Sequence, residues 1–441
     1  MTASRPTLNR EILRLAVPAL GALVAEPLFL IVDSALVGHL GVVPLAGLGI
    51  ASAVLQTIVG LMVFLAYSTT PAVARRFGAG DHTSAVQAGV DGLWLALGLG
   101  AVLAVVGSVL TRPLVAMFGA SPEVAEQAVI YLQLSMWGLP AMLIVFAATG
   151  LLRGMQDTVT PLWIAGLGFT ANALLNWLFI YGFGWGIAGS AAGTVAAQWG
   201  MVGAYALVVG RLARRHAASV LPQREGVRGS ARSGGWLFLR TVSLRLALLA
   251  TVGVATGIGT EELAGWQVAF TIFSTAAFAL DALAIAAQAL IGRGLGADDE
   301  PFVRRVLART VAWGVWFGVV VGVVIAVASG AIGLLFTGDP LVAALVQPAL
   351  LVLAVAQPLC GVVFVLDGVL MGAGDARYLA IAGALNLVPY APALILVALL
   401  APAGAAGLAW LAVCFFGVYM AARLATLGWR VRRPEWLSVT V

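Results

Sequence analysis

The sequence contains no lysine, and all 24 of its basic side chains are arginine. A phosphate-binding loop of the Gly-x-x-x-x-Gly-Lys-Ser/Thr type needs a lysine, so this chain cannot hydrolyse ATP through one. Cysteine is almost absent as well, because Cys360 and Cys414 are the only two and both lie inside apolar runs. His39, His82 and His216 are scattered, without the spacing of metal ligands. We therefore expect no disulfide framework, no structural metal and no cofactor.

Charge of either sign is also scarce. Charged residues make up only 10% of the 441 residues, hydrophobic residues make up 61%, and the mean hydropathy is +1.03. Soluble domains carry roughly 25% charged residues. Apolar runs of 20 or more residues recur along the chain, and each is long enough to cross a ~30 Å hydrocarbon core as a helix. These runs are apolar all round, whereas strands of a membrane barrel alternate polar and apolar residues.

The apolar runs predict an all-α integral membrane protein with about twelve transmembrane helices. The arginines, except Arg112 and the intrahelical Arg245, gather in alternate loops, in the two tails and at the adjoining helix ends. The positive-inside rule then places both termini in the cytoplasm, in a multi-pass protein of the inner (cytoplasmic) membrane. The same placement explains the sequence pI of 9.7 without a nucleic-acid partner. The expected helices are 12–38, 45–72, 84–110, 123–152, 160–182, 188–210, 236–258, 263–291, 306–333, 341–371, 378–400 and 405–428.

The second half of the sequence repeats the first at a constant offset of 218 residues. A register kept without gaps over some 150 residues indicates a duplication. Each half has six predicted crossings, so both share one orientation and a pseudo-twofold axis along the membrane normal is expected. We expect an N-terminal lobe at 1–210, a cytoplasmic linker at 211–235 and a C-terminal lobe at 236–441. The matches include Gly41 with Gly259, Arg75 with Arg293, Asp81 with Asp299, Pro140 with Pro358, Gly154 with Gly372, Asp157 with Asp375 and Gly186 with Gly404.

Ionisable residues inside a bilayer cost about 2.5–3.5 kcal/mol on insertion scales and are candidates for function. Asp33, Asn176 and Thr194 each lie about six residues, or about 9 Å, from the outer end of their predicted helices. Asn172 lies one turn deeper than Asn176 on the same face. One carboxylate, two amides and a hydroxyl could line one cavity, where they would bind a proton or a transient Na⁺. Hydrogen bonding between helices is the structural alternative.

The first helix carries a second acid, Glu26, seven residues before Asp33 and on a similar face. Pro18 and Pro27 interrupt the same helix, so it could bend during gating or simply hold a fixed kink. Asp91 lies nearer the cytoplasmic end of the third helix, where water would solvate it.

The second half places Arg245 inside the seventh helix, Asp281 and Gln288 on the eighth, and Asp367 on the tenth. We expect Arg245 to pair with Asp281 or with Asp367, because pairing lowers the cost of burying charge. Such a pair would serve either as a structural ion pair or as a substrate or proton site.

At these residues the sequence resembles the multidrug and toxic compound extrusion (MATE) family, in its DinF-like branch. The first helix carries Glu26-Pro27-Leu28 and the run VDSALVGHLG from Val32, which look like that branch's signature. The segments Asn172 to Asn176 and Gly186 to Ser190 look like the family's fifth and sixth helices. The segment from Asp367 to Asp375 looks like its tenth.

The resemblance implies two six-helix lobes around a V-shaped cleft, with drug export driven by cations or protons. It also implies that Asp33 is a coupling acid, joined by Asn172, Asn176 and Thr194. The sequence departs from the family at Asn176, where many members have aspartate. Asp367 matches an acid of the second lobe, but the family's glutamate on the seventh helix is missing and Arg245 is there instead.

Two functions remain open from the sequence, and neither is enzymatic. The first is a monomeric antiporter in the lipid bilayer that exports amphipathic organic small molecules, cationic ones among them, in exchange for H⁺ or Na⁺. The second is a flippase for a lipid-linked precursor. A membrane scaffold or receptor is a third hypothesis, and the duplicated halves and intramembrane acids argue against it.

Overall fold

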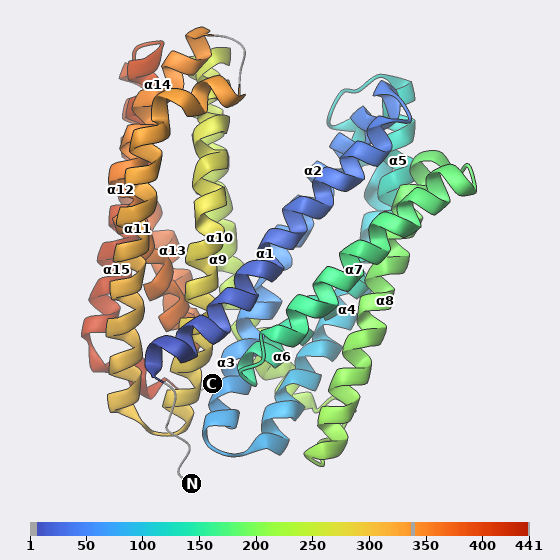
Figure 1. The fold of residues 1–441 in the computed structure, drawn as a ribbon, viewed down its shortest axis with the longest axis vertical. Helices are drawn as coiled ribbons and strands as arrows, with labels where there is room; N and C mark the ends of the chain where they lie inside the picture. The colour runs from blue at the N-terminus through green and yellow to red at the C-terminus, as the bar shows by residue number, and fades with distance from the viewer. Residues whose placement is uncertain (1–6, 337–339, 440–441) are drawn as a thin grey trace. The chain divides into compact units, whose positions relative to one another are not determined.

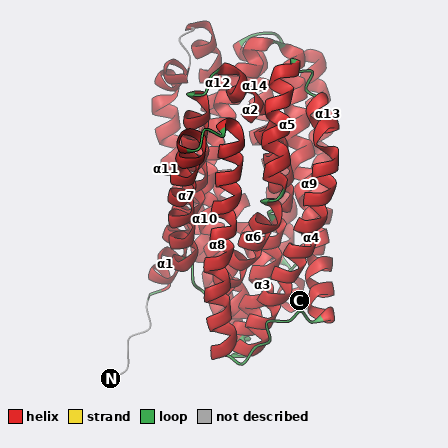
Figure 2. Cartoon of the chain, turned by 90° about the vertical axis from the view of Figure 1, so that its right-hand side faces the viewer, coloured by secondary structure: helices red, strands yellow, loops and turns green. Residues whose placement is uncertain are grey.

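The computed structural model describes residues 7–336 and 340–439, and the regular elements of that part of the chain are all helices (Figures 1 and 2). Helices satisfy their own backbone hydrogen bonds, which hydrocarbon cannot do. In the described ranges, eleven helices or helix pairs are long and apolar enough to span a membrane, and α5 with α6, bent by 49°, makes a twelfth. The prediction of about twelve transmembrane helices is confirmed.

The chain forms two compact units, and each is described by itself. The N-terminal unit comprises residues Val17–Gly234, and the C-terminal unit comprises the described residues up to Ala16 together with those from Gly235 onward. The helices that begin in the N-terminal half are α1 (Leu8–Gly38), α2 (Val42–Met62), α3 (Phe64–Gly78), α4 (His82–Ala116), α5 (Pro122–Met136), α6 (Leu139–Gly154), α7 (Val159–Trp177), the π-helical turn η1 (Leu178–Gly182) and α8 (Gly186–Arg215).

The second half of the chain is helical throughout its described residues as well, apart from short connections. Large apolar side chains such as Val327, Val355 and Leu399 are exposed on its helices, as expected of surfaces that face lipid. The helices are α9 (Arg224–Ile258), α10 (Thr260–Gly296), α11 (Glu300–Phe336), α12 (Pro340–Gly372), α13 (Ala376–Leu400), α14 (Ala405–Ala412), the π-helical segment η2 (Val413–Tyr419), α15 (Met420–Arg432) and a short 3₁₀ turn η3 (Pro434–Ser438).

The predicted linker is shorter than expected. The sequence placed it at 211–235, because that stretch is rich in arginine, glycine and serine. In the structure α8 continues to Arg215 and α9 begins at Arg224, so only 216–223 connects them. Arginine is a good helix former, and its long side chain can reach water from a helix surface. The polar composition of 211–235 is therefore shared by the connecting segment and by the helix ends on either side of it.

The repeat seen in the sequence is also a repeat of helix packing. Gly150 of α6 lies so close to α3 that a Cβ there would stand 2.7 Å from the Ala66 carbonyl oxygen. Gly368 of α12 approaches α10 in the same way, with a Cβ position 2.5 Å from the Ala284 carbonyl oxygen. Gly368 lies 218 residues after Gly150, and Ala284 lies 218 residues after Ala66. In each half, an equivalent glycine thus allows two helices to approach closely, α6 and α3 in the first half and α12 and α10 in the second.

Loop geometry repeats at the same offset. Asp81 accepts a hydrogen bond from the Ser84 backbone N–H at 2.9 Å, and Asp299 accepts one from Phe302 at 2.9 Å, so equivalent aspartates cap α4 and α11. Backbone positions with positive φ recur as well. They are Gly80 (80°) with Asp298 (52°), Gln156 (65°) with Gly374 (75°), and Gly186 (57°) with Gly404 (90°).

Gly150→Ala is expected to destabilise the protein by about 1–3 kcal/mol, because the added methyl group meets a carbonyl oxygen that can move only if the helices separate. Gly98→Ala is the matched control, since a Cβ at this helical position has no neighbour within 4 Å. Thermal unfolding of the detergent-solubilised variants measures both. Equal unfolding temperatures for the two variants would contradict the packing argument.

Candidate functional site

The N-terminal unit buries a cluster of polar side chains around Asp33. Asp33 on α1 accepts hydrogen bonds at Oδ1 from Asn176 Nδ2 (2.8 Å) and from Ser190 Oγ (2.6 Å). Its Oδ2 accepts a third from Tyr131 Oη at 3.2 Å. The donors come from α7, α8 and α5, so one carboxylate ties α1 to three other helices. Asp33 is only 4% exposed although it carries an ionisable group.

The hydrogen-bond chain continues away from the carboxylate. Asn176 Nδ2 also donates to Asn172 Oδ1 at 3.0 Å, and Asn172 Nδ2 donates to Thr194 Oγ1 at 3.0 Å. The Asn176 Oδ1 atom is buried and has no hydrogen-bond partner among the described residues. The four residues singled out from helical depth therefore form one connected network.

Two members of the network were missed by the sequence analysis. Ser190 lies four residues before Thr194, so helical spacing alone puts it on the same face of α8. It is the last residue of the segment from Gly186 to Ser190 that resembles the family's sixth helix. Tyr131 gave no comparable signal, because a tyrosine in an apolar helix is usually core. Its hydroxyl reaches Asp33 only through the tertiary fold, in which α5 packs against α2 and α8.

The other candidates of the first helix lie outside this network. Glu26 is exposed on α1, and among the described residues it makes no hydrogen bond or ion pair. Pro18 and Pro27 both lie inside α1, which runs as one helix from Leu8 to Gly38. A proline removes a backbone donor from a helix, so α1 carries two weakened points on the N-terminal side of Asp33.

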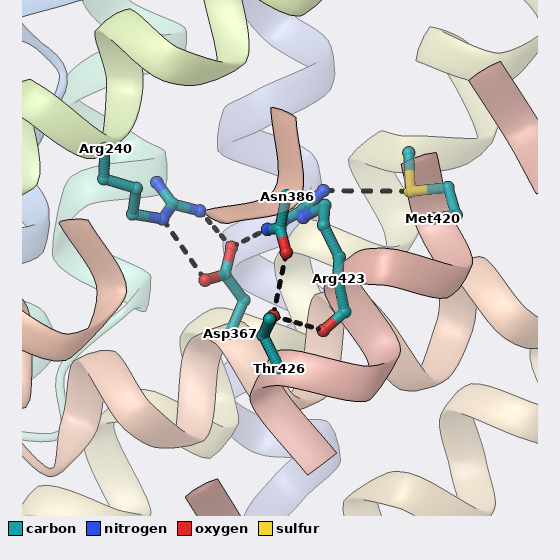
Figure 3. A network of polar contacts seen from close by, with 6 residues as sticks. All are labelled: Arg240, Asp367, Asn386, Met420, Arg423 and Thr426. Atoms are coloured by element: carbon teal, nitrogen blue, oxygen red, sulfur yellow. Dashed lines mark hydrogen bonds and ion pairs between the residues drawn. The ribbon is translucent and has the colours of Figure 1, made fainter. Parts of the chain in front are cut away.

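The C-terminal unit has its own buried polar cluster, centred on Asp367 of α12 (Figure 3). Its carboxylate pairs with the guanidinium of Arg240 from α9 and with that of Arg423 from α15, the latter at 2.9 Å. Arg423 also lies over the Phe364 ring, 5.9 Å from its centre. Next to this pair of contacts, Thr426 Oγ1 donates to Asn386 Oδ1 at 3.0 Å. The cluster connects α9, α12, α13 and α15.

The predicted pairing of Arg245 with Asp367 is wrong. Arg245 is exposed and makes no ion pair among the described residues, and Arg240 contacts Asp367 in its place. Five residues along a helix correspond to a rotation of about 140°, so the two arginines point in different directions. Arg245 likewise makes no ion pair with Asp281, which is half-buried on α10, while Gln288 on the same helix is buried.

No group of three or more histidine, cysteine, aspartate or glutamate side chains in the described residues could hold a metal ion. A cation at Asp33 would instead use amide and hydroxyl oxygens, such as those of Asn176, Ser190 and Thr194, together with one carboxylate. Oxygen donors of this kind suit a hard cation such as Na⁺, and the carboxylate alone suits a proton.

These features define a class of protein: a multi-pass helical membrane protein of two duplicated six-helix units, with an ionisable cluster buried in each. The sequence pattern of the MatE family matches residues 18–178 and 238–393 of this chain. The chain therefore belongs to the MatE family, whose members are multidrug and toxic compound efflux transporters and not enzymes.

Individual relatives agree with this assignment. The chain is 30% identical to Protein DETOXIFICATION 44, chloroplastic, of Arabidopsis thaliana over 97% of this chain and 84% of the relative. It is 28% identical to DNA damage-inducible protein F of Escherichia coli over 66% of this chain and 64% of the relative. Among solved structures, the Vibrio cholerae MATE transporter VcmN in its bent form has the same fold. It superposes with a TM-score of 0.88 at 23% identity, covering 98% of this chain and 97% of that one.

Proposed function

We propose that this protein is a secondary active antiporter that exports amphipathic organic compounds in exchange for protons or sodium ions bound at Asp33. We further propose that it resides in the cytoplasmic membrane with both termini in the cytoplasm, on the side where its arginines gather. The observation that carries the proposal is the buried Asp33 carboxylate, which accepts hydrogen bonds from three other helices. The alternative of a lipid-linked precursor flippase is not supported by the comparisons.

The hydrogen bonds of Asp33 depend on its charge. An ionised carboxylate only accepts hydrogen bonds, whereas a protonated one also donates. The hydroxyls of Ser190 and Tyr131 can rotate to accept a hydrogen bond from the protonated Asp33 carboxyl group. The Asn176 amide nitrogen can only donate one. Binding a proton or a cation at Asp33 therefore changes how α1 is held against α7 and α8.

The change at Asp33 can reach the rest of the protein through α1. The prolines at 18 and 27 weaken the helix between Asp33 and its cytoplasmic end. Two related solved structures are described as MATE in a bent and in a straight conformation. If the ion and the transported compound prefer different conformations of this protein, their movements are coupled.

The test is transport by the purified full-length protein in liposomes, with proton and sodium gradients imposed independently. A fluorescent organic cation trapped inside the vesicles is the probe. We expect one of the two gradients to accelerate its movement well above that in protein-free vesicles. Equal rates with and without protein under both gradients, for cationic, neutral and anionic probes, would overturn the proposal.

A further inference from the structure

The short segment that joins α8 to α9 is fastened to α4 along its length. The side chains that hold it are Thr83, Gln87, Asp91 and Trp94, whose spacing places them on one face of α4. All of these residues belong to the N-terminal unit. The contacts are Thr83 Oγ1 to the His216 carbonyl (2.6 Å), Trp94 Nε1 to the Val220 carbonyl (3.0 Å), Gln87 Nε2 to the Leu221 carbonyl (3.0 Å), and the Gln223 backbone N–H to Asp91 Oδ1 (2.8 Å).

Asp91 is the one charged group in this set. The sequence predicted that water would solvate it, but the structure buries it. It is 2% exposed and also accepts a hydrogen bond from Gln87 Nε2 at 3.1 Å. Its carboxylate lies at the beginning of α9, where unpaired backbone N–H groups and the helix dipole favour a negative charge. Gly226 permits this approach, because a Cβ there would overlap Asp91 Oδ2. Asp91 therefore caps α9 from another helix.

Helix α9 leaves the N-terminal unit after Gly234, its eleventh residue of 35. Its residues up to Gly234 pack with that unit, and a Cβ at Gly234 would lie 2.7 Å from the Phe64 ring. From Gly235 onward the helix belongs to the C-terminal unit, although it is continuous from Arg224 to Ile258. The crossing falls at Ser233-Gly234-Gly235, and serine–glycine pairs are a recognised cause of helix kinks.

We propose that Asp91 is a positioning residue for transport. It fixes the first turns of α9 to the N-terminal unit, so that movement between the two units is taken up inside α9 at Ser233–Gly235. This inference rests on the proposed transport function, because alternating access requires the units to move. A flexible connector would absorb such movement, whereas one held at four points along α4 cannot. The other covalent passage between the units is in α1, between Ala16 and Val17 and next to Pro18.

Hydrogen–deuterium exchange of the full-length protein in detergent tests the joint without requiring transport. We expect the amides of 234–238 to exchange faster than those earlier and later in α9. Gly235→Ala should slow that local exchange about fivefold, because alanine stabilises a helix relative to glycine. Gly253→Ala is the matched control, since both positions lie in α9 and a Cβ at either has no neighbour within 4 Å. Uniform exchange along α9 would overturn the proposal.

The Asp91 part of the proposal has its own readout. Asp91→Ala should raise exchange of the amides in 220–227 at least tenfold, because it removes a buried charged acceptor. Asp91→Asn keeps a carbonyl acceptor for the Gln223 N–H and should restore most of the protection. If the alanine variant does not fold, the asparagine variant and Gly226→Ala, which pushes against the same carboxylate, replace it. Unchanged exchange in 220–227 would show that Asp91 does not hold the connector.

Transport by the same proteins in liposomes connects the joint to function. Gly235→Ala and Asp91→Ala should slow movement of the fluorescent cation severalfold, while Gly253→Ala should match the unsubstituted protein. Full transport by Gly235→Ala would place the joint elsewhere. If the unsubstituted protein shows the expected exchange pattern but transports no probe under either gradient, the proposed function fails while the joint in α9 stands.

Discussion

Replacing Asp33 by asparagine is expected to reduce gradient-driven transport to the rate of protein-free vesicles. Asparagine keeps the size and shape of the side chain but cannot bind or release a proton near neutral pH, and it carries no charge for a cation. The variant should still fold, because the hydroxyls of Ser190 and Tyr131 can rotate to match a neutral amide. The measurement is transport in liposomes under each imposed gradient, with the unfolding temperature recorded for the same preparation.

Two companion variants show whether the loss belongs to the Asp33 network. Glu26→Gln removes an acid from the same helix outside the network and should transport normally. Ser190→Ala keeps the acid but removes its 2.6 Å hydrogen bond, a charged contact worth about 1.5–3 kcal/mol, and should shift the ion dependence without abolishing transport. Normal transport by Asp33→Asn would place the coupling site elsewhere, with Glu26, Asp281 and Asp367 as the candidates. Complete loss in Glu26→Gln would point to Glu26.

The largest expected effect on stability is that of Asp367→Ala. Arg240 and Arg423 would lose the carboxylate that they share in a buried part of the C-terminal unit. Removing one partner from a buried ion pair costs about 3–5 kcal/mol, because the remaining charge stays away from water. We therefore expect a large drop in the unfolding temperature of the detergent-solubilised protein.

Glu300→Ala provides the matched control for Asp367→Ala. Glu300 pairs with Arg304 at 2.6 Å, but both side chains are more than half exposed. Removing an exposed pair of this spacing should cost only about 0.3–0.5 kcal/mol. Arg245→Ala should have a similarly small effect, since that side chain is exposed. Equal unfolding temperatures for the Asp367 and Glu300 variants would show that the Asp367 cluster does not stabilise the C-terminal unit.

The candidate site of the first half was largely predictable, because the depth of each of its residues in a helix can be counted along the sequence. Asp33, Asn176 and Thr194 stand at similar distances from helix ends, Asn172 lies one turn deeper, and apolar surroundings make each of them conspicuous. The depth of a residue in its helix does not show toward which neighbouring helix its side chain points. Ser190 shared the face of Thr194 and could have been included. Tyr131 could not, since its role depends on how α5 is turned toward α1.

The second-half cluster shows the same limit more severely. The sequence pointed to Asp367 but not to its partners Arg240 and Arg423. Arg245 lies deeper in the apolar run than Arg240 and was therefore the more conspicuous residue. Arg423 and Asn386 lie on helices whose neighbours cannot be read from sequence distance. An ion pair between two helices depends on how each helix is rotated about its axis and on whether the two helices are neighbours. The amino-acid composition gives none of this information.

Three properties could be predicted without coordinates: that the chain is a helical membrane protein, roughly where its apolar helices lie, and that its halves are duplicated. These properties follow from hydrophobic length and from identities at a fixed offset, both of which are local or one-dimensional. Three others became known from the packing of the helices: which buried polar groups meet, that α9 begins inside the predicted linker, and that Asp91 is buried against the connector. Those outcomes depend on which side of each helix faces its neighbours. Close contacts between helices, such as that of Gly150 with Ala66, set this orientation.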